Sequence, residues 1–190
     1  MPRPEVGEVR FYIEELEKQG YRVQKKPPVE RASAQLQFPI KAGGSVKVGL
    51  VADTHIGSTL QQITALTDFY KYADSRGVQA YLHAGDMLEG IHQAHRDAAY
   101  EQYAHGVDAQ VKAVEQQYPR SQNGPTHFID GNHDDWAFQQ AGITSGALIA
   151  AKRDDLKYLG YHSAFVTLND QVRFLLQHGA RGGVAYTKSY

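Results

Sequence analysis

Apolar residues occur along the chain in two kinds of spacing, and the two kinds alternate from residue 46 onward. Short apolar runs have the length and composition of buried strands, at 46–52, 78–84 and 126–130. In the segments that follow them, apolar positions recur every three or four residues, which predicts helices at 60–76, 98–118 and 144–153. Strands that alternate with helices are typical of an α/β layered fold.

Two further strand patterns lie near the end of the chain. Residues 163–168 and 171–177 are strand-like and flank Asn169-Asp170, a pair of residues that favours a two-residue hairpin turn. Because a hairpin makes antiparallel strands, a second sheet of mixed or antiparallel character is expected beside the first.

The first 45 residues have a different pattern and are expected to form an N-terminal extension, with the main domain at 46–190. A helix is predicted at 6–19, and short strands are predicted at 21–23 and 36–38. Gly20 and the basic turn at 25–28 make this segment resemble the back half of a winged-helix unit. A DNA-binding role would rest on that analogy alone, and the alternative is an extension that packs on the main domain.

Composition excludes several kinds of chemistry. The chain has 190 residues, a net charge of −1 and no cysteine, so disulfides, zinc–thiolate sites and cysteine nucleophiles are excluded. The net charge does not favour nucleic acid or an anionic membrane, although a local basic groove is compatible with it. No apolar run is long enough to span a bilayer, and the N-terminus lacks the apolar core of a signal peptide. We therefore expect a cytoplasmic protein without a membrane partner.

Polar residues of the kinds that bind metals follow four of the predicted strands: Asp53 and His55, then Asp86, then Asn132-His133-Asp134, and finally His178. The carboxyl ends of strands in an α/β sheet form the crevice where ligands bind, so these side chains are expected to meet. Carboxylate and amide oxygens combined with imidazoles suit Mn, Fe, Zn or Ni better than calcium. Taken singly, an Asp-x-His or a Gly-Asp after a strand is common, whereas Gly131-Asn132-His133-Asp134 is far more specific.

These motifs, in this order and spacing, resemble the calcineurin-like metallophosphoesterases over residues 46–190. The resemblance implies a four-layer α/β/β/α sandwich and two divalent ions, with manganese expected first and iron, zinc, nickel or magnesium as alternatives. It implies that the first ion is held by Asp53 and His55, that Asp86 bridges the two ions, and that the second is held by Asn132 and His178.

The resemblance also implies two catalytic residues that do not bind metal. His133 would face the substrate, stabilising the phosphoryl charge or protonating the leaving oxygen. Asp134 would orient and charge His133. His83 and His127, which lie inside strands next to ligands, are expected to pack or to support the ligands.

One family motif is absent: no Gly-His-x-His follows His178. We therefore expect a C-terminally truncated chain with an incomplete second sheet, unless the missing ligands come from elsewhere. An incomplete sheet leaves an apolar edge, which favours self-association.

Three further residues are candidates for substrate contacts. They are His92, His95 and Arg181, and the alternatives are a solvated loop for the histidines and a flexible turn for the arginine. Tyr100, Tyr103 and Tyr118 are expected in the core.

Residues 178–186 look most like phosphoesterases of phage and prophage origin, so nucleic acid, DNA or RNA, is the first expected substrate of a phosphodiesterase or nuclease. A phosphoprotein or small phosphomonoester is the second, and a non-catalytic binding subunit that keeps the fold is the alternative from another class.

Overall fold

The computed structural model describes residues 18, 32–38, 44–91 and 100–179. The chain divides into two units, Met1–Glu30 and Arg31–Tyr190, and the strands and helices named below belong to the second unit. The helix predicted at 6–19, apart from Lys18, and the strand predicted at 21–23 lie outside the described residues, so the winged-helix interpretation stays a hypothesis.

The larger sheet has four parallel strands in the order β2-β3-β4-β5. They are β2 (Val48–Val51), β3 (Ala80–His83), β4 (Thr126–Asp130) and β5 (Leu156–Tyr161). Strands β3 and β4 are buried along their whole length, which explains why apolar residues occupy adjacent positions in both strands, with polar residues at their ends. Strand β5 was not predicted, because Lys157 and Gly160 interrupt its pattern and it directly follows a predicted helix.

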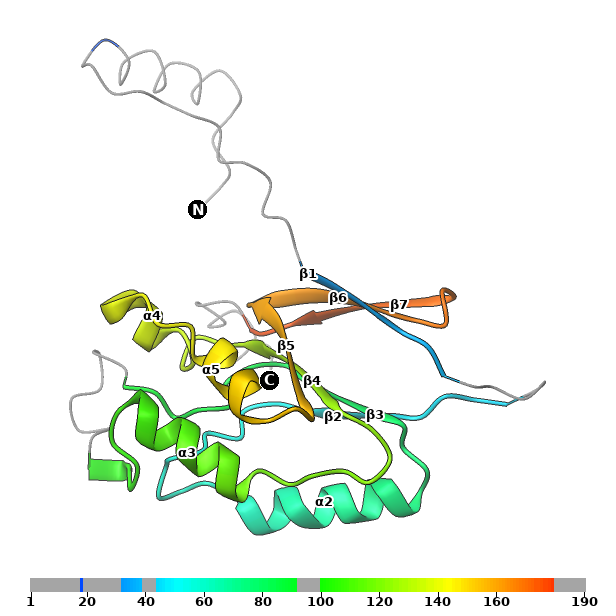
Figure 1. Ribbon diagram of the computed structural model, residues 1–190, viewed down its shortest axis with the longest axis horizontal. Coiled ribbons are helices and arrows are strands. Elements are labelled where there is room, and N and C mark those ends of the chain that lie inside the picture. The colour runs from blue at the N-terminus through cyan, green and yellow to red at the C-terminus, as the bar shows by residue number, and fades with distance from the viewer. Residues whose placement is uncertain (1–17, 19–31, 39–43, 92–99, 180–190) are drawn as a thin grey trace, which may run out of the picture. The chain divides into compact units, whose positions relative to one another are not determined.

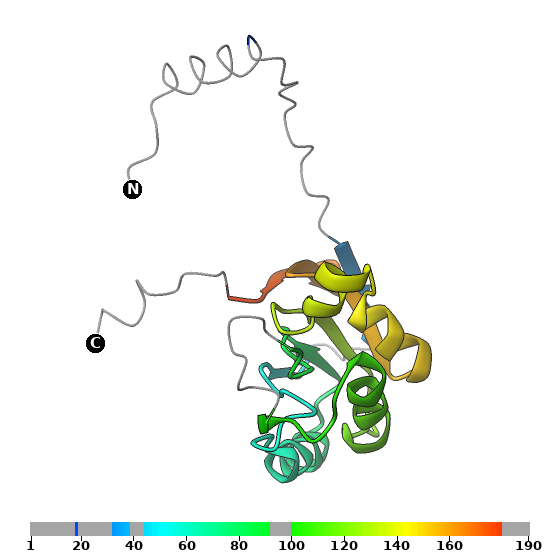
Figure 2. The same ribbon diagram turned by 90° about the vertical axis from the view of Figure 1, so that its left-hand side faces the viewer.

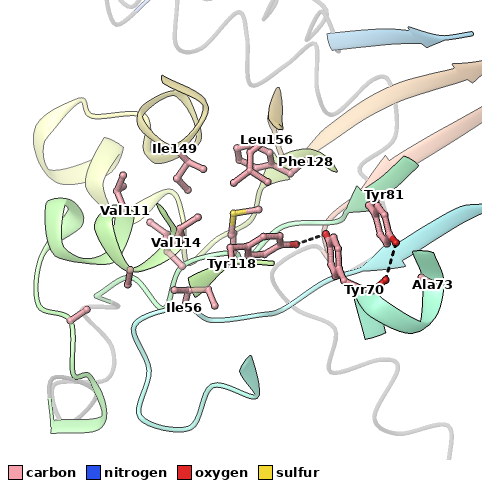
Figure 3. Packing of buried hydrophobic residues seen from close by; sticks show 14 of the residues in the cluster. Ile56, Tyr70, Ala73, Tyr81, Val111, Val114, Tyr118, Phe128, Ile149 and Leu156 are labelled. Carbon is pink, nitrogen blue, oxygen red and sulfur yellow. Dashed lines mark hydrogen bonds between the residues drawn. The ribbon is translucent and has the colours of Figure 1, made fainter. Parts of the chain in front are cut away.

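Helices α2 (Ile63–Ser75), α3 (Val107–Gln117) and α5 (Ser145–Lys152) contribute to the core on one face of this sheet. A short helix that was not predicted, α4 (Trp136–Ala141), precedes α5. In the core, the Tyr70 hydroxyl lies 3.1 Å from that of Tyr118 (Figure 3). It also lies 2.7 Å from the Thr126 hydroxyl. These hydroxyl groups are buried, and pairing them avoids the desolvation cost of leaving them without partners.

The smaller sheet packs on the other face of the large sheet (Figure 1). It comprises β1 (Ala32–Leu36), β6 (Ser163–Leu168) and β7 (Val172–Gln177), with β1 parallel and β7 antiparallel to β6. The predicted mixed sheet and its hairpin are therefore confirmed, and the turn residues Asn169 and Asp170 both have positive φ, as a tight hairpin requires. An apolar cluster between the two sheets includes Leu82, Ile129, Val166 and Leu176.

The predicted α/β sandwich is thus confirmed, and the described residues form three of its four expected layers: the helices, the large sheet and the small sheet (Figure 2). The boundary expected at residue 45 is wrong, because β1 pairs with β6 and belongs to the second sheet. The strand expected at 36–38 lies at Ala32–Leu36, where alternate residues face the inter-sheet core.

The helix predicted at 98–118 is shorter than its apolar spacing suggested. It begins at Val107, because Gly106 precedes it with a φ of 85° that helical backbone cannot continue through. Tyr118 is buried as expected, but Tyr100 is 88% exposed and Tyr103 is also exposed, so the prediction of a core position is wrong for these two. Helix α2 likewise begins at Ile63 rather than at residue 60.

Strand β7 pairs with one neighbour within the described part of the chain, and several of its apolar side chains are exposed, namely Val172, Phe174 and Leu175. An edge strand of this kind offers backbone groups to another strand. Self-association through this edge stays a prediction. Sedimentation of wild type and Phe174→Glu would test it, since the charge should weaken any association.

His127 gives a prediction about stability and pH. Burial, followed by the charge of Lys157, lowers the pKa of this imidazole from 6.5 to about 4. Its contribution to stability is therefore complete above pH 6.5 and is lost as pH falls toward 4, because the unfolded chain takes up the proton first. We expect His127→Leu to reduce the loss of stability across this window by up to about 3 kcal/mol.

Urea unfolding of the metal-free chain at several pH values measures this effect. An equal loss of stability with falling pH in wild type and variant would contradict it.

Candidate metal centre

The loops that follow β2 and β3 run side by side and bring their polar residues together. The backbone amide of Asp53 donates to the Gly85 carbonyl at 3.0 Å, and that of His55 donates to the Asp86 carbonyl at 3.1 Å. The two loops therefore stay in register beyond the ends of their strands, and both aim side chains at the same edge of the sheet.

Two groups of potential ligands form at this edge, and Asp86 belongs to both. One group contains Asp53, Asp86 and His178, the other contains His55, Asp86 and His133, and within each group the ligand atoms lie within 4.8 Å of one another. The structure thus brings together five of the residues that the sequence motifs singled out. Carboxylate oxygens with imidazole nitrogens form a donor set that fits divalent transition metals.

The backbone at these positions is held in an unusual conformation. Asp53, His55 and Asp86 have φ values of 54°, 46° and 55°, in the left-handed region that side chains other than glycine rarely adopt. Such residues tend to cluster at functional sites, where the surrounding structure holds them in place.

The two glycines beside the ligands are required by close packing, as their position in the motifs suggested. A Cβ atom on Gly85 would lie 2.7 Å from His178 Nδ1, and Gly85 itself has a φ of 98°. A Cβ atom on Gly131 would lie 2.6 Å from the backbone nitrogen of Asp86 and would overlap its carboxylate. The approach of the two loops therefore depends on the missing side chains.

Gly131→Ala is accordingly expected to displace the Asp86 carboxylate and to lower manganese affinity at least about tenfold. Titration calorimetry with Mn²⁺ measures this. The matched control is Gly142→Ala, which strains a left-handed helix end but meets nothing within 4 Å. Equal affinity in wild type and Gly131→Ala would show that the packing does not position the ligand.

His178 is oriented by the end of the neighbouring strand. Its Nδ1 lies 2.8 Å from the Ala84 carbonyl oxygen and must carry the proton, so that Nε2 presents a lone pair. This Nε2 lies 3.2 Å from Asp86 Oδ2 and 3.0 Å from Asn132 Oδ1. Asn132, His178 and Asp86 therefore converge, and their role as ligands of a second ion stays a prediction.

His133 is held at both its backbone and its ring. Its amide donates to Asp86 Oδ1 at 2.8 Å, and its Nδ1 lies 2.6 Å from the Glu89 carbonyl oxygen. The ring also packs edge-on against His55, with ring centroids 4.7 Å apart. A protonated Nδ1 bound to this carbonyl fixes the orientation of the ring.

Asp134 has a different role from the one that the sequence predicted. Its buried carboxylate accepts hydrogen bonds from the backbone amides of Gly131, Leu88 and Met87, at 2.8, 2.8 and 3.2 Å. The ring contact expected of Asp134 is made by the Glu89 carbonyl instead. Asp134 therefore ties the loop after β4 to the loop after β3, and through these backbone hydrogen bonds it helps to position the segment that carries His133.

Glu89 was missed by the sequence analysis. Its Oε2 lies 3.2 Å from Nδ1 of His55, and its side chain is largely buried. The sequence did contain a signal for this residue. Glu89 follows Asp86 by three residues and precedes Gly90, so that one helical turn or one tight loop brings its carboxylate near Asp86. Glu89 thus supports both imidazoles, His55 through its carboxylate and His133 through its carbonyl.

His83 supports the centre from inside β3, as predicted. Its Nδ1 accepts a hydrogen bond from the Gly85 amide at 3.2 Å, and its Nε2 lies 3.1 Å from the Thr54 hydroxyl. Burial lowers its pKa to about 3, and the electrostatic effect of the neighbouring imidazoles of His178 and His55 lowers it further. A neutral His83 therefore joins the two ligand loops without competing for metal.

Acidic groups accumulate behind the ligands in the described structure. Burial, followed by repulsion from Asp134, raises the pKa of Asp130 to about 8, and burial raises that of Asp134 to about 6. Cations nearby would favour the charged forms of both groups.

The predicted substrate contacts His92, His95 and Arg181 lie outside the described residues and stay predictions.

Fold and site together define a layered α/β protein with a metal centre at the carboxyl edge of its parallel sheet. The chain belongs to the calcineurin-like phosphoesterase family, whose model matches residues 46–188. Membership indicates a metal-dependent hydrolase of phosphoesters. Comparison with curated proteins gave no significant match. Among the described residues, no helix is long and apolar enough to cross a membrane.

Proposed function

We propose that the chain hydrolyses phosphoesters with two divalent ions, the first choice being manganese. The observation that carries this is the single carboxylate Asp86, which belongs to both groups of potential ligands. Two ions about 3.5–4 Å apart clamp a phosphoryl group and lower the pKa of a water molecule. The ligands proposed are Asp53, His55, Asp86, Asn132 and His178.

The chain's own contribution to the chemistry is a proton donor fixed beside this centre. In the reaction, water oxygen bonds to phosphorus, the ester P–O bond breaks, and the leaving oxygen needs a proton. A protonated His133 donates through Nε2 to that oxygen while Nδ1 donates to the Glu89 carbonyl, which lies 2.6 Å away. Asp134 holds the two loops so that ring and centre stay aligned.

The test is hydrolysis of bis-p-nitrophenyl phosphate by chelator-treated protein, reconstituted in turn with Mn²⁺, Fe²⁺, Zn²⁺, Ni²⁺ and Mg²⁺. We expect activity to return with about two ions per chain, with manganese the most effective. Activity that needs no ion, or saturates at one ion per chain, would contradict the two-metal proposal. Binding of two ions without any hydrolysis would support the alternative of a non-catalytic subunit.

Nucleic acid was the first substrate expected from the phage-like resemblance, and it stays a proposal. Polyanion binding generally needs lysine and arginine around the site. Among the described residues that line the cavity beside Asp53 and His55, there are glutamates but no lysine or arginine. A small phosphoester is therefore the substrate that we favour, and direct comparison with single-stranded DNA and RNA would decide between them.

A further inference from the structure

A cavity of about 430 Å³ opens directly beside Asp53 and His55. Its walls are the loop at 51–62, the first turn of α2 and the side chains of Glu89 and Glu101. A volume in this range accommodates a small organic group. Because two of the proposed metal ligands form part of its wall, the cavity adjoins the candidate metal centre.

The cavity has an apolar side that is otherwise unexplained. Leu60, Ile63 and Leu66 line it, and Leu60 is 69% exposed at its rim. An isolated exposed leucine needs no explanation, but here it continues an apolar surface that leads into a polar site. This arrangement of apolar walls next to a few convergent polar groups is characteristic of small-molecule sites.

Hydrogen bonds fix the loop that carries Leu60. The side-chain oxygen of Gln61 accepts a hydrogen bond from the Gly57 amide at 3.0 Å, and its side-chain nitrogen donates to Oε1 of Gln117 in α3 at 2.8 Å. The Thr59 amide donates to the Glu101 carbonyl at 2.7 Å, and the Leu60 amide donates to the Ser58 hydroxyl at 3.3 Å. The wall is therefore formed in advance, so a ligand does not have to order it.

Charge limits what this cavity accepts. Glu89 and Glu101 are part of the wall, and the described lining contains no lysine or arginine. A second phosphate or a carboxylate on the bound group would be repelled by these two glutamates. An uncharged group avoids that repulsion and gains from contact with the leucines and Ile63.

We propose that this cavity is a leaving-group pocket, which binds the uncharged, ring-sized apolar group of the alcohol released from the phosphoester. The proposal rests on the proposed function, since it assumes that the phosphoryl group lies at the metal centre. It makes Leu60, Ala65 and Glu101 determinants of specificity and not of chemistry.

Phosphonates that cannot be hydrolysed test the pocket by binding alone. Titration calorimetry of the Mn²⁺-loaded chain should show phenylphosphonate binding about 10- to 100-fold more tightly than methylphosphonate, from burial of the ring. Ala65→Trp should abolish this preference, because residue 65 lines the pocket from an exposed position where the larger side chain does not disturb the core. The matched control is Thr64→Trp, also exposed and adjacent but outside the lining, which should keep the preference.

A second comparison tests the charge. A carboxylate on the ring, as in 4-phosphonobenzoate, should weaken binding about tenfold relative to phenylphosphonate, and Glu101→Gln should recover part of the loss. Equal binding of phenyl- and methylphosphonate, or an unchanged preference in Ala65→Trp, would overturn the pocket. The proposed function would still stand if methylphosphonate bound to the manganese-loaded chain. Absence of binding by either phosphonate to the manganese-loaded chain would overturn both.

Discussion

Asp86→Asn is expected to lower the affinity for both metal ions at least about 100-fold and to reduce hydrolysis to background. The reason is geometric, because Asp86 belongs to both ligand groups and its carboxylate is almost fully buried between His133 and His178. An amide oxygen at the same place accepts the backbone hydrogen bond from His133 but carries no charge for two cations. Calorimetric titration with Mn²⁺ and metal analysis after gel filtration give affinity and stoichiometry.

The control for this substitution is Asp68→Asn, which removes an equal charge from the exposed surface of α2. It should bind metal as wild type does. If Asp86→Asn lost one ion and kept the other at full affinity, Asp86 would be a ligand of a single site and not a bridge. Unchanged stoichiometry and affinity would remove it from the centre altogether.

The central part of the fold could be predicted because its signals are local. Strands β3 and β4 have adjacent apolar residues and are buried on both faces, and the hairpin turn at Asn169-Asp170 has the residues that positive φ favours. The positions of the proposed ligands followed from the same logic, since each polar motif begins where a strand ends. These features depend on neighbouring residues and not on the rest of the chain.

The features that were missed depend on contacts between distant segments. Strand β1 belongs to the small sheet only because Ala34 and Leu36 meet Val166 and Leu168, more than a hundred residues later. The contact of Glu89 with His55 and that of Asp134 with Leu88 likewise exist only once two loops are side by side. The sequence motifs therefore indicated where the candidate metal centre lies. They could not indicate which carboxylate contacts which imidazole.

His133→Ala is expected to lower kcat about 10²- to 10⁴-fold while leaving manganese content unchanged. The structure permits two roles for this ring, since His133 also groups with His55 and Asp86 as a potential ligand. Its Nδ1 lies against the Glu89 carbonyl, and we expect Nε2 to act either on a metal ion or on the substrate. Measuring metal content and turnover on the same preparations separates the two.

The leaving group distinguishes proton donation from stabilisation of phosphoryl charge. A nitrophenolate leaves readily without a proton, whereas an alkoxide does not, so a proton donor matters more for an alkyl ester. We therefore expect the loss of kcat in His133→Ala to be larger for methyl phosphodiesters than for bis-p-nitrophenyl phosphate. We also expect the dependence of kcat on pH to lose the limb that arises from the general acid. His105→Ala, at an exposed position in the described structure, is the matched control and should behave as wild type. Equal losses of kcat for both leaving groups would assign His133 to stabilisation of the phosphoryl charge. Parallel loss of metal and activity would make His133 a metal ligand, because the same Nε2 cannot hold an ion and deliver a proton in one turnover.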